Sequence, residues 1–255
     1  MTDATLDAKE DALRRLSLAG GITMKRILIV LFFVLAPSVT PLSAGDIRGT
    51  ILFEGGAPKP IPLSMKADQA CSVQHKQPVN SEEVVVNQNG TLKNVFVYVK
   101  DGLGATKFDP PAGKAFLDQK GCVYLPHVLG MQVGQELEFL NSDPCLHTAK
   151  GSPKVNTPFN LAEPMQGMKL TKKFSNAEIF LLQCAAHNWM NAYVGVFSHP
   201  FFAVTGDDGS FSIKGLPAGE YTIEAWQEKY GTRTITVAIG AADVKTVDFK
   251  YKGTN

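Results

Sequence analysis

Residues 180–196 read FLLQCAAHNWMNAYVGV, two apolar runs on either side of a short segment rich in metal-donor side chains. The runs 179–182 and 193–197 are rich in β-branched and aromatic residues, which is typical of strands. The segment between them, 184–190, is therefore predicted to be a loop whose two ends are held by neighbouring strands of one sheet. Such a loop can point several donor atoms at one place.

The loop carries a thiolate, an imidazole and a thioether, from Cys184, His187 and Met190, in the pattern Cys-x2-His-x2-Met. A second imidazole, His147, lies upstream at the end of a predicted strand, just past the turn at Pro144. That position suits a side chain at the rim of a sandwich. One Cys, two His and a weak Met form the donor set of a mononuclear electron-transfer copper site, because soft sulfur favours Cu(I) and imidazole accepts Cu(II).

The chain after Asp46 alternates apolar and polar residues with a period of two, and turn residues interrupt it often. No long stretch of helical periodicity occurs after residue 46, so the sequence predicts an all-β sandwich. The predicted strands before residue 200 lie at 47–53, 95–99, 133–139, 170–174, 179–182 and 193–197.

From residue 201 the turns come closer together, and four short strands fit into about 50 residues. So few strands bury little core alone. We therefore expect this segment to lean on the preceding domain and to recruit the Gly-rich strand at 46–56. The predicted strands of this second domain contain residues 211–213, 221–225, 235–239 and 247–251.

The N-terminus resembles an export signal. Lys25 and Arg26 precede an apolar run of about ten residues. A stretch that ends in small residues follows, which is typical of a cleavage site, here near Ala44. The run is shorter than the roughly 20 residues that span a bilayer. We predict an N-terminal extension plus signal peptide over 1–44, with Met24 as a possible start, and a periplasmic or secreted protein without a membrane span after cleavage. An amphipathic helix followed by an uncleaved anchor stays an alternative.

Charge and histidine content exclude several function classes. The net charge is +1 and 19% of residues are charged, so no basic surface for nucleic acid is expected. Enzymes with several copper ions need His-x-His pairs, and this chain has five histidines and no such pair. A Ser-His-Asp order and a Gly-rich phosphate loop are also missing from the sequence. We predict that the protein is not an enzyme.

The Asn-Ser-Asp-x-x-x-His segment that ends at His147, followed later by the Cys-x2-His-x2-Met loop, resembles the cupredoxin (blue-copper) family. With the motifs Tyr124–His127, Cys184–Met190 and His199–Thr205, the chain resembles more closely exported plastocyanin-like or methylamine-utilisation-type proteins. The resemblance implies a Greek-key β-sandwich over residues 45–200 that carries single electrons through one Cu(I)/Cu(II) ion. It implies His147, Cys184 and His187 as equatorial ligands and Met190 as the axial one. It also implies exported redox partners such as c-type cytochromes or dehydrogenases.

The segment from Asp208 to Trp226 is similar to carboxypeptidase-regulatory-like and rhamnogalacturonan-lyase-associated β-domains. That similarity implies a small carbohydrate-binding-like (transthyretin-like) sandwich over 201–255. An alternative function follows: a carbohydrate-binding or surface-docking module with a degenerate copper site. Tyr221, Trp226 and Tyr230 are the candidate stacking residues, although core packing is the expected role of Tyr221. A periplasmic copper carrier is a further alternative.

Some residues near the motifs depart from the family pattern. The spacing from His187 to Met190 is short, and Thr148 replaces the Asn that often ties the two ligand loops together. Cys145 precedes His147 by two residues and is expected on the same side of the strand. Trp189 is expected to pack over the site.

The remaining cysteines and polar residues have structural expectations. We expect Cys71 and Cys122 to form a disulfide, although four cysteines allow three connectivities. Asp143 is predicted mainly to form a turn. His127 and His199, each beside a proline, are predicted to cap turns or bond the backbone.

Overall fold

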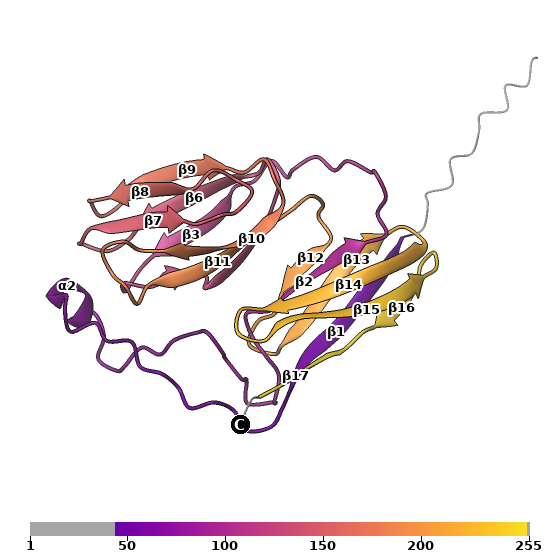
Figure 1. Ribbon diagram of the computed structural model, residues 1–255, viewed down its shortest axis with the longest axis horizontal. Helices are drawn as coiled ribbons and strands as arrows, with labels where there is room; N and C mark the ends of the chain where they lie inside the picture. Colours follow the sequence, from indigo (N-terminus) through magenta and orange to yellow (C-terminus); the bar gives the residue numbers. More distant parts are fainter. Residues whose placement is uncertain (1–43, 254–255) are drawn as a thin grey trace, which may run out of the picture. The chain divides into compact units, whose positions relative to one another are not determined.

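A computed structural model describes residues 44–253 (Figure 1). The predicted signal peptide and the possible start at Met24 lie outside the described residues. Among the residues described, the helical structure is the four-residue helix α2 (Gln69–Ser72), and the rest is strands and connecting segments. The all-β prediction is therefore confirmed. No helix within this part of the chain is long and apolar enough to cross a membrane.

Two sheets pack face to face, and one of them carries the segment 184–190, which we call the donor loop. Alternate side chains of both sheets are buried between them, including Leu117, Phe139, Leu182 and Val194. One sheet has the order β5 (Val128–Gln132), β11 (Asn191–Phe197), β10 (Glu178–Gln183), β7 (His147–Gly151) and β8 (Phe159–Glu163). The other has the order β4 (Tyr124–Leu125), β3 (Ala115–Gln119), β6 (Glu136–Asn141) and β9 (Lys169–Lys173).

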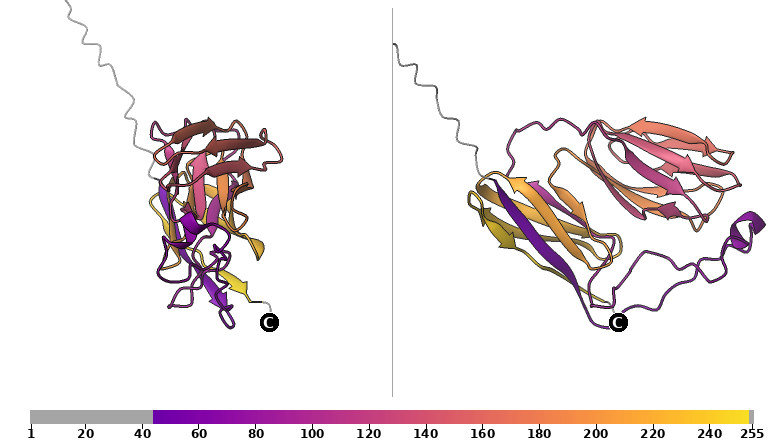
Figure 2. Two further views of the ribbon diagram at one scale, coloured as in Figure 1. Left: turned by 90° about the vertical axis from the view of Figure 1, so that its left-hand side faces the viewer. Right: turned by 180° about the vertical axis from the view of Figure 1, so that it is seen from behind.

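A second pair of sheets contains the C-terminal strands. In one sheet β1 (Gly45–Glu54) lies between β13 (Ser210–Leu216) on one side and β16 (Val244–Thr246) and β17 (Phe249–Lys252) on the other (Figure 2). The other sheet has the order β12 (Phe202–Val204), β2 (Phe96–Asp101), β14 (Gly219–Gln227) and β15 (Gly231–Ile239).

The predicted recruitment of the 46–56 strand is confirmed by the pairing of β1 with β13, β16 and β17. The structure goes further, because β2 also pairs with C-terminal strands, β12 and β14. Strand pairing thus crosses the predicted division at residue 200, and the described residues 44–253 belong to one compact unit. The reason is burial: Ile47, Ile51, Val97 and Val99 fill the core that the C-terminal strands cannot fill alone.

An aromatic cluster joins strands of the two sheet pairs. Its buried rings are those of Phe96 on β2 and Phe197 on β11, and the side chain of Val128 on β5 is buried with them. The Phe96 ring lies 5.5 Å from the ring of Phe197 and 5.6 Å from that of Trp226. A Cβ at Gly195 would approach the Phe96 ring to 2.7 Å, so this position of β11 needs glycine.

The segment between β1 and β2 contains α2. Asp68 caps this short helix by accepting hydrogen bonds from the backbone N–H groups of Ala70 and Cys71. Cys71 forms a disulfide with Cys122, which follows β3. The disulfide fastens α2 beside the loop that carries the predicted metal ligands.

Candidate metal centre

The donor loop connects β10 to β11 and closes on itself. The two strands pair in register up to Gln183 and Asn191, as the apolar runs predicted. Inside the loop the Cys184 N–H donates to the Met190 carbonyl, and the Met190 N–H donates to the His187 carbonyl, both at 3.1 Å. The loop backbone is therefore held by hydrogen bonds at both ends.

His147, Cys184 and His187 converge at one point. His147 is the first residue of β7, which neighbours β10 in the sheet. The two imidazole Nδ1 atoms lie 3.1 Å apart, and the Cys184 Sγ lies 3.6 Å from the His187 Nδ1 and 4.0 Å from the His147 Nδ1. All three side chains are buried. We call these three atoms the donor triangle.

The size of the donor triangle suits a transition-metal ion. A trigonal ion with bonds of about 2.0 Å to nitrogen and about 2.3 Å to sulfur keeps its donors about 3.5–3.7 Å apart. The observed separations of 3.1, 3.6 and 4.0 Å bracket those values. Two imidazoles and one thiolate are also the equatorial set of a mononuclear copper site. The residues present therefore fit copper.

The Cys184 thiolate is stabilised by its surroundings. Burial on its own raises the pKa of this thiol, but hydrogen bonds from His147 and the Thr148 backbone N–H outweigh burial and lower the pKa to about 6. The Thr148 N–H lies 3.4 Å from the sulfur. Burial lowers the pKa of His147, but Asp143 and Cys184 together raise it to about 9. Without metal, the pair is a thiolate beside an imidazolium.

Both imidazoles are oriented by carboxylates on their far side. The Nε2 of His147 lies 2.9 Å from Asp143 Oδ2, and the Nε2 of His187 lies 3.1 Å from Asp68 Oδ2. Each carboxylate therefore accepts a hydrogen bond from the Nε2–H of one histidine. The Nδ1 of each ring is then the nitrogen that faces the donor triangle.

The prediction that Asp143 mainly forms a turn was incomplete. Its backbone does form a turn, since its N–H donates to the Asn141 side chain at 2.9 Å. Its carboxylate, however, also accepts hydrogen bonds from the backbone N–H groups of Gly121 and Cys122 and holds His147. The sequence analysis did not identify Asp68, because no motif near residue 68 indicates a contact with a histidine 119 residues later in the chain.

Thr148 ties the two ligand segments together. Its hydroxyl accepts a hydrogen bond of 2.7 Å from the Ala185 N–H, and its own backbone N–H donates to the Cys184 sulfur. Thr148 thus joins the start of β7 to the donor loop, which is the connection that an Asn at this position often makes in the cupredoxin pattern.

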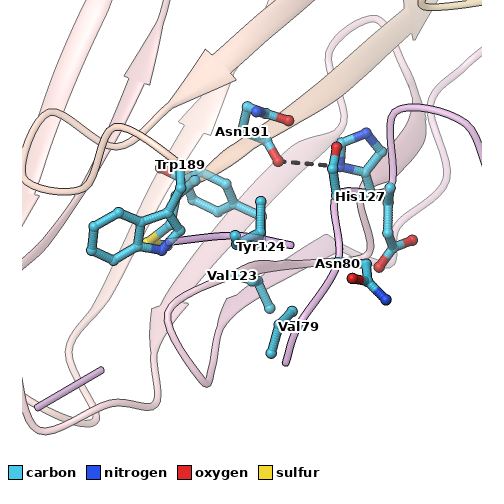
Figure 3. Close-up of a pocket in the computed structure, with 11 residues that line it drawn as sticks. Val79, Asn80, Val123, Tyr124, His127, Trp189 and Asn191 are labelled. Carbon is cyan, nitrogen blue, oxygen red and sulfur yellow. Dashed lines mark hydrogen bonds between the residues drawn. The ribbon is translucent and has the colours of Figure 1, made fainter. Parts of the chain in front are cut away.

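Trp189 and Met190 lie beside the donor triangle. The Trp189 ring lies 4.9 Å from the His187 ring, and its Nε1 donates to the Cys122 carbonyl at 3.1 Å. Met190 is 1% exposed and lines a cavity of about 40 Å³ together with Trp189 and Tyr124 (Figure 3). The axial role of Met190 stays a prediction.

Cys145 lies on the same side of the chain as His147 but faces the other edge of its ring. The Cys145 Sγ is 3.6 Å from the His147 Nε2, whereas the donor triangle uses Nδ1. Burial, followed by the charge of Asp143, raises the pKa of Cys145 to about 11. Cys145 therefore belongs to a different group of side chains from the donor triangle.

The two histidines beside prolines bond the backbone, as predicted. The Nε2 of His199 lies 2.8 Å from the Val99 carbonyl, and the Nδ1 of His127 lies 3.2 Å from the Asn191 carbonyl (Figure 3). His127 also pairs through Nε2 with Glu228, at 2.6 Å. No local pattern indicates that pair, because Glu228 lies 101 residues further along the chain.

Replacing Asp143 with asparagine is expected to weaken copper binding by about 10- to 100-fold, because the carboxylate orients His147 and raises its basicity. The measurement is a copper titration against a competing chelator. Asp109→Asn is the matched control, since Asp109 is exposed. An affinity of Asp143→Asn within about 2-fold of the wild type would contradict this role, given the effect expected of such partners.

The metal-free protein is expected to show thiolate ultraviolet absorbance that rises as the pH passes about 6, because Cys184 loses its proton there. A second rise is expected near pH 11, from Cys145. Cys184→Ser removes the first step and keeps the second. If the wild type shows no step below pH 8, the thiolate–imidazolium pair does not form.

Comparisons with known proteins found one family model and a set of similar structures. The family model of the carboxypeptidase regulatory-like domain matches residues 190–252. No curated protein matches the chain. Solved cupredoxins are among the similar structures.

Three of the similar structures contain copper proteins. A Cu-containing nitrite reductase from Thermus scotoductus SA-01 is 23% identical, with a TM-score of 0.29, over 37% of this chain and 24% of the reductase. A purple cupredoxin from Nitrosopumilus maritimus is 19% identical, with a TM-score of 0.29, over 32% of this chain and 99% of that one. A mutant amicyanin in its reduced Cu(I) form is 19% identical, with a TM-score of 0.30, over 39% of this chain and 97% of the amicyanin chain. This chain is thus similar to cupredoxins in one part and matches a carboxypeptidase regulatory-like domain in another.

Proposed function

We propose that this chain is an exported copper protein of the cupredoxin type that carries single electrons. The donor triangle of His147, Cys184 and His187 supports the proposal more than any other observation. Its three atoms lie within 4.8 Å of one another, all three residues are buried, and the chemistry of the set suits both oxidation states of copper.

The residues around the donor triangle are arranged to keep it rigid. Asp143 fixes the His147 ring, Asp68 fixes the His187 ring, and the Thr148 N–H fixes the Cys184 sulfur. Copper bound here would alternate between Cu(I) and Cu(II) and so supply one electron at a time. A rigid set of donors keeps the rearrangement between the two states small, which suits electron transfer.

Little space for a substrate adjoins the donor triangle. His147 is fully buried and His187 is 4% exposed, so their side chains exclude water. The cavity that Met190 and Trp189 line has a volume of about 40 Å³, which is small compared with the roughly 300–1,000 Å³ of ligand pockets. We therefore propose an electron carrier and not an enzyme, with Met190 as the axial ligand.

Exported redox proteins such as c-type cytochromes or dehydrogenases are the proposed partners. They follow from the resemblance to electron-carrying cupredoxins and from the predicted signal peptide. The equal numbers of acidic and basic residues in 45–255 argue against strong electrostatic steering toward such a partner.

A second candidate function rests on the C-terminal strands. Tyr221 is buried in the core, as expected, and Tyr230 packs against Phe53 and Tyr251. Trp226, by contrast, lines an open groove of about 350 Å³ together with Tyr98. An aromatic groove of this kind suits the face of a sugar ring. Loss of glycan binding in Trp226→Ala, with copper binding intact, would support a carbohydrate-binding role for this surface.

The deciding experiment is a Cu(II) titration of residues 45–255, followed by visible absorption, EPR and voltammetry. The proposal expects one copper per chain, an intense thiolate-to-copper band and a reversible one-electron couple with the metal retained in both states. Loss of the metal on reduction would favour a copper carrier instead. A colourless protein without stoichiometric copper would overturn the copper function.

A further inference from the structure

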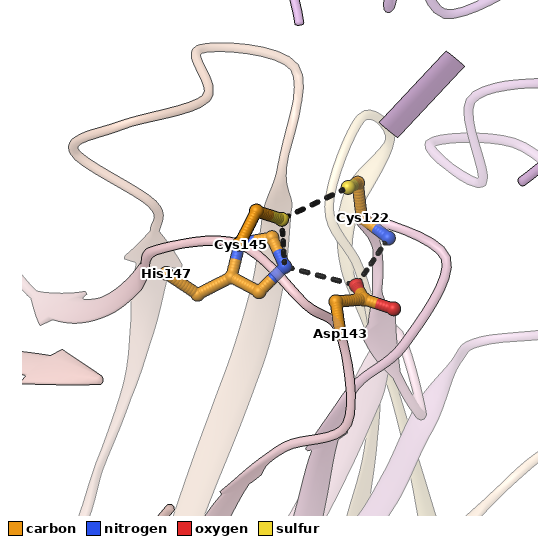
Figure 4. A group of neighbouring side chains, drawn as sticks. All are labelled: Cys122, Asp143, Cys145 and His147. Atoms are coloured by element: carbon orange, nitrogen blue, oxygen red, sulfur yellow. Dashed lines mark hydrogen bonds and ion pairs between the residues drawn. The ribbon is translucent and has the colours of Figure 1, made fainter. Parts of the chain in front are cut away.

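A second group of soft donors lies outside the donor triangle, on the Nε2 side of the two histidines. Figure 4 shows two of its members, Cys122 and Cys145, beside His147. The group consists of the Cys71–Cys122 disulfide and the free thiol of Cys145, and we call it the sulfur triad. The Cys145 Sγ lies 3.8 Å from the Cys122 Sγ and 3.6 Å from the His147 Nε2. The Cys71 Sγ lies 3.6 Å from the His187 Nε2.

Three separate segments bring these sulfur atoms together. Cys71 comes from α2, Cys122 from the turn between β3 and β4, and Cys145 from the segment between β6 and β7. Cys71 and Cys122 are fully buried, whereas Cys145 is partly exposed. The triad is therefore a preformed cluster that has one side open to solvent.

The surroundings of the sulfur triad favour a cation. Asp143 accepts hydrogen bonds from the Cys122 N–H at 2.7 Å, and Asp68 accepts one from the Cys71 N–H at 3.3 Å. Among the described residues, the side chains that form ion pairs with these two carboxylates are His147 and His187. No lysine or arginine of residues 44–253 forms a salt bridge with either carboxylate, so no permanently charged cation of the described residues competes with a metal ion here.

We propose that the sulfur triad becomes a second metal site, for one Cu(I) ion, when the Cys71–Cys122 disulfide is reduced. A dithiol reductant supplies two electrons and two protons, the S–S bond breaks, Cys71 and Cys122 become thiols, and the reductant leaves as its own disulfide. Binding of Cu(I) then releases the thiol protons of its ligands to solvent. Soft thiolates select Cu(I) over harder ions.

The geometry needs only one sulfur to move. An ion with three bonds of about 2.3 Å to sulfur keeps the sulfur atoms about 4 Å apart. Cys122 and Cys145 already have that spacing, at 3.8 Å. Cys71 must separate from Cys122, and it lies on a four-residue helix in the long connection between β1 and β2. The chain would thus hold one more copper ion in reducing than in oxidising surroundings.

The test is the Cu(I) stoichiometry of residues 45–255, measured without oxygen against a phenanthroline-type chelator. One sample is first treated with a tertiary phosphine, which reduces the disulfide with water and leaves as the phosphine oxide. The reduced wild type is expected to bind one more Cu(I) per chain than the oxidised wild type. The gain is expected to disappear in Cys145→Ser and to remain in Cys184→Ser.

The gain is measured as a difference, so it is independent of the donor triangle. If the donor triangle binds no copper, the counts become zero and one in place of one and two, and the gain is the same. Circular dichroism checks that each variant is folded, and the oxidised Cys145→Ser protein retains its disulfide. X-ray absorption of reduced Cys184→Ser is expected to show sulfur ligands around the additional copper. No gain on reduction, or a full gain in Cys145→Ser, would overturn the proposal.

Discussion

Cys184→Ser is expected to abolish the visible thiolate-to-copper band, and to weaken copper binding by more than the roughly 10- to 100-fold that loss of an orienting partner causes. The reason is that serine stays protonated at neutral pH, whereas hydrogen bonds lower the pKa of Cys184 to about 6. The protein loses its one anionic donor of the triangle. The measurement is a copper titration followed by visible absorption and chelator competition.

The matched control is Cys145→Ser in the oxidised protein. Both cysteines are free, and both sulfur atoms lie 3.6 Å from a histidine nitrogen, but only Cys184 faces Nδ1 atoms. The band is therefore expected to survive in Cys145→Ser. If the band disappears in Cys145→Ser and persists in Cys184→Ser, the ligand assignment is wrong.

Phe96→Ala is expected to lower the free energy of unfolding by about 3–5 kcal/mol, the usual cost of removing a buried Phe side chain. Phe96 is fully buried and contacts the rings of Phe197 on β11 and Trp226 on β14. Gly195 leaves no side chain to fill the resulting cavity. The measurement is denaturant unfolding of the metal-free protein, monitored by fluorescence and circular dichroism.

Phe116→Ala provides the comparison, because Phe116 is 44% exposed on β3. We expect a change of less than about 1 kcal/mol there, since the exposed ring gives up little buried area. Because the aromatic cluster joins strands of the two sheet pairs, Phe96→Ala is also expected to separate the unfolding transitions of the two pairs. Equal destabilisation by both substitutions would contradict the role of Phe96 in the core, and coincident transitions of the two pairs in Phe96→Ala would show that the cluster does not couple them.

The donor loop was predictable because its signal is local. Period-two runs on each side of 184–190 specify a hairpin, and a hairpin forces Cys184 and His187 toward the same end of a sheet. His147 was predicted at the end of a strand just past the proline turn, but the structure makes it the first residue of the next strand, β7. All three residues of the donor triangle therefore followed from windows of a few residues.

The orienting contacts were not predictable in this way. Asp68 meets His187 through a helix of four residues that no periodicity reveals, and the contact depends on a disulfide between distant segments. The side of the ring that Cys145 faces depends on how the chain bends between β6 and β7, since only strictly extended residues alternate sides. The pairing of β1 and β2 with C-terminal strands depends on the topology of the whole sheet.

Because β1 pairs with β17, the first described strand completes its pairing only after the last strand has been synthesised. The Thr50 N–H donates to Asp248 across 198 residues, and β1 and β17 run parallel over Ile51–Glu54 and Phe249–Lys252. Contacts of such high contact order form slowly. Until residue 252 has been synthesised, the part of this edge of β1 over Ile51–Glu54 has no partner, because β16 pairs only with Asp46–Arg48. An open strand edge is a template for aggregation. A chain truncated before residue 249 would leave Ile51–Glu54 without a partner on this edge permanently.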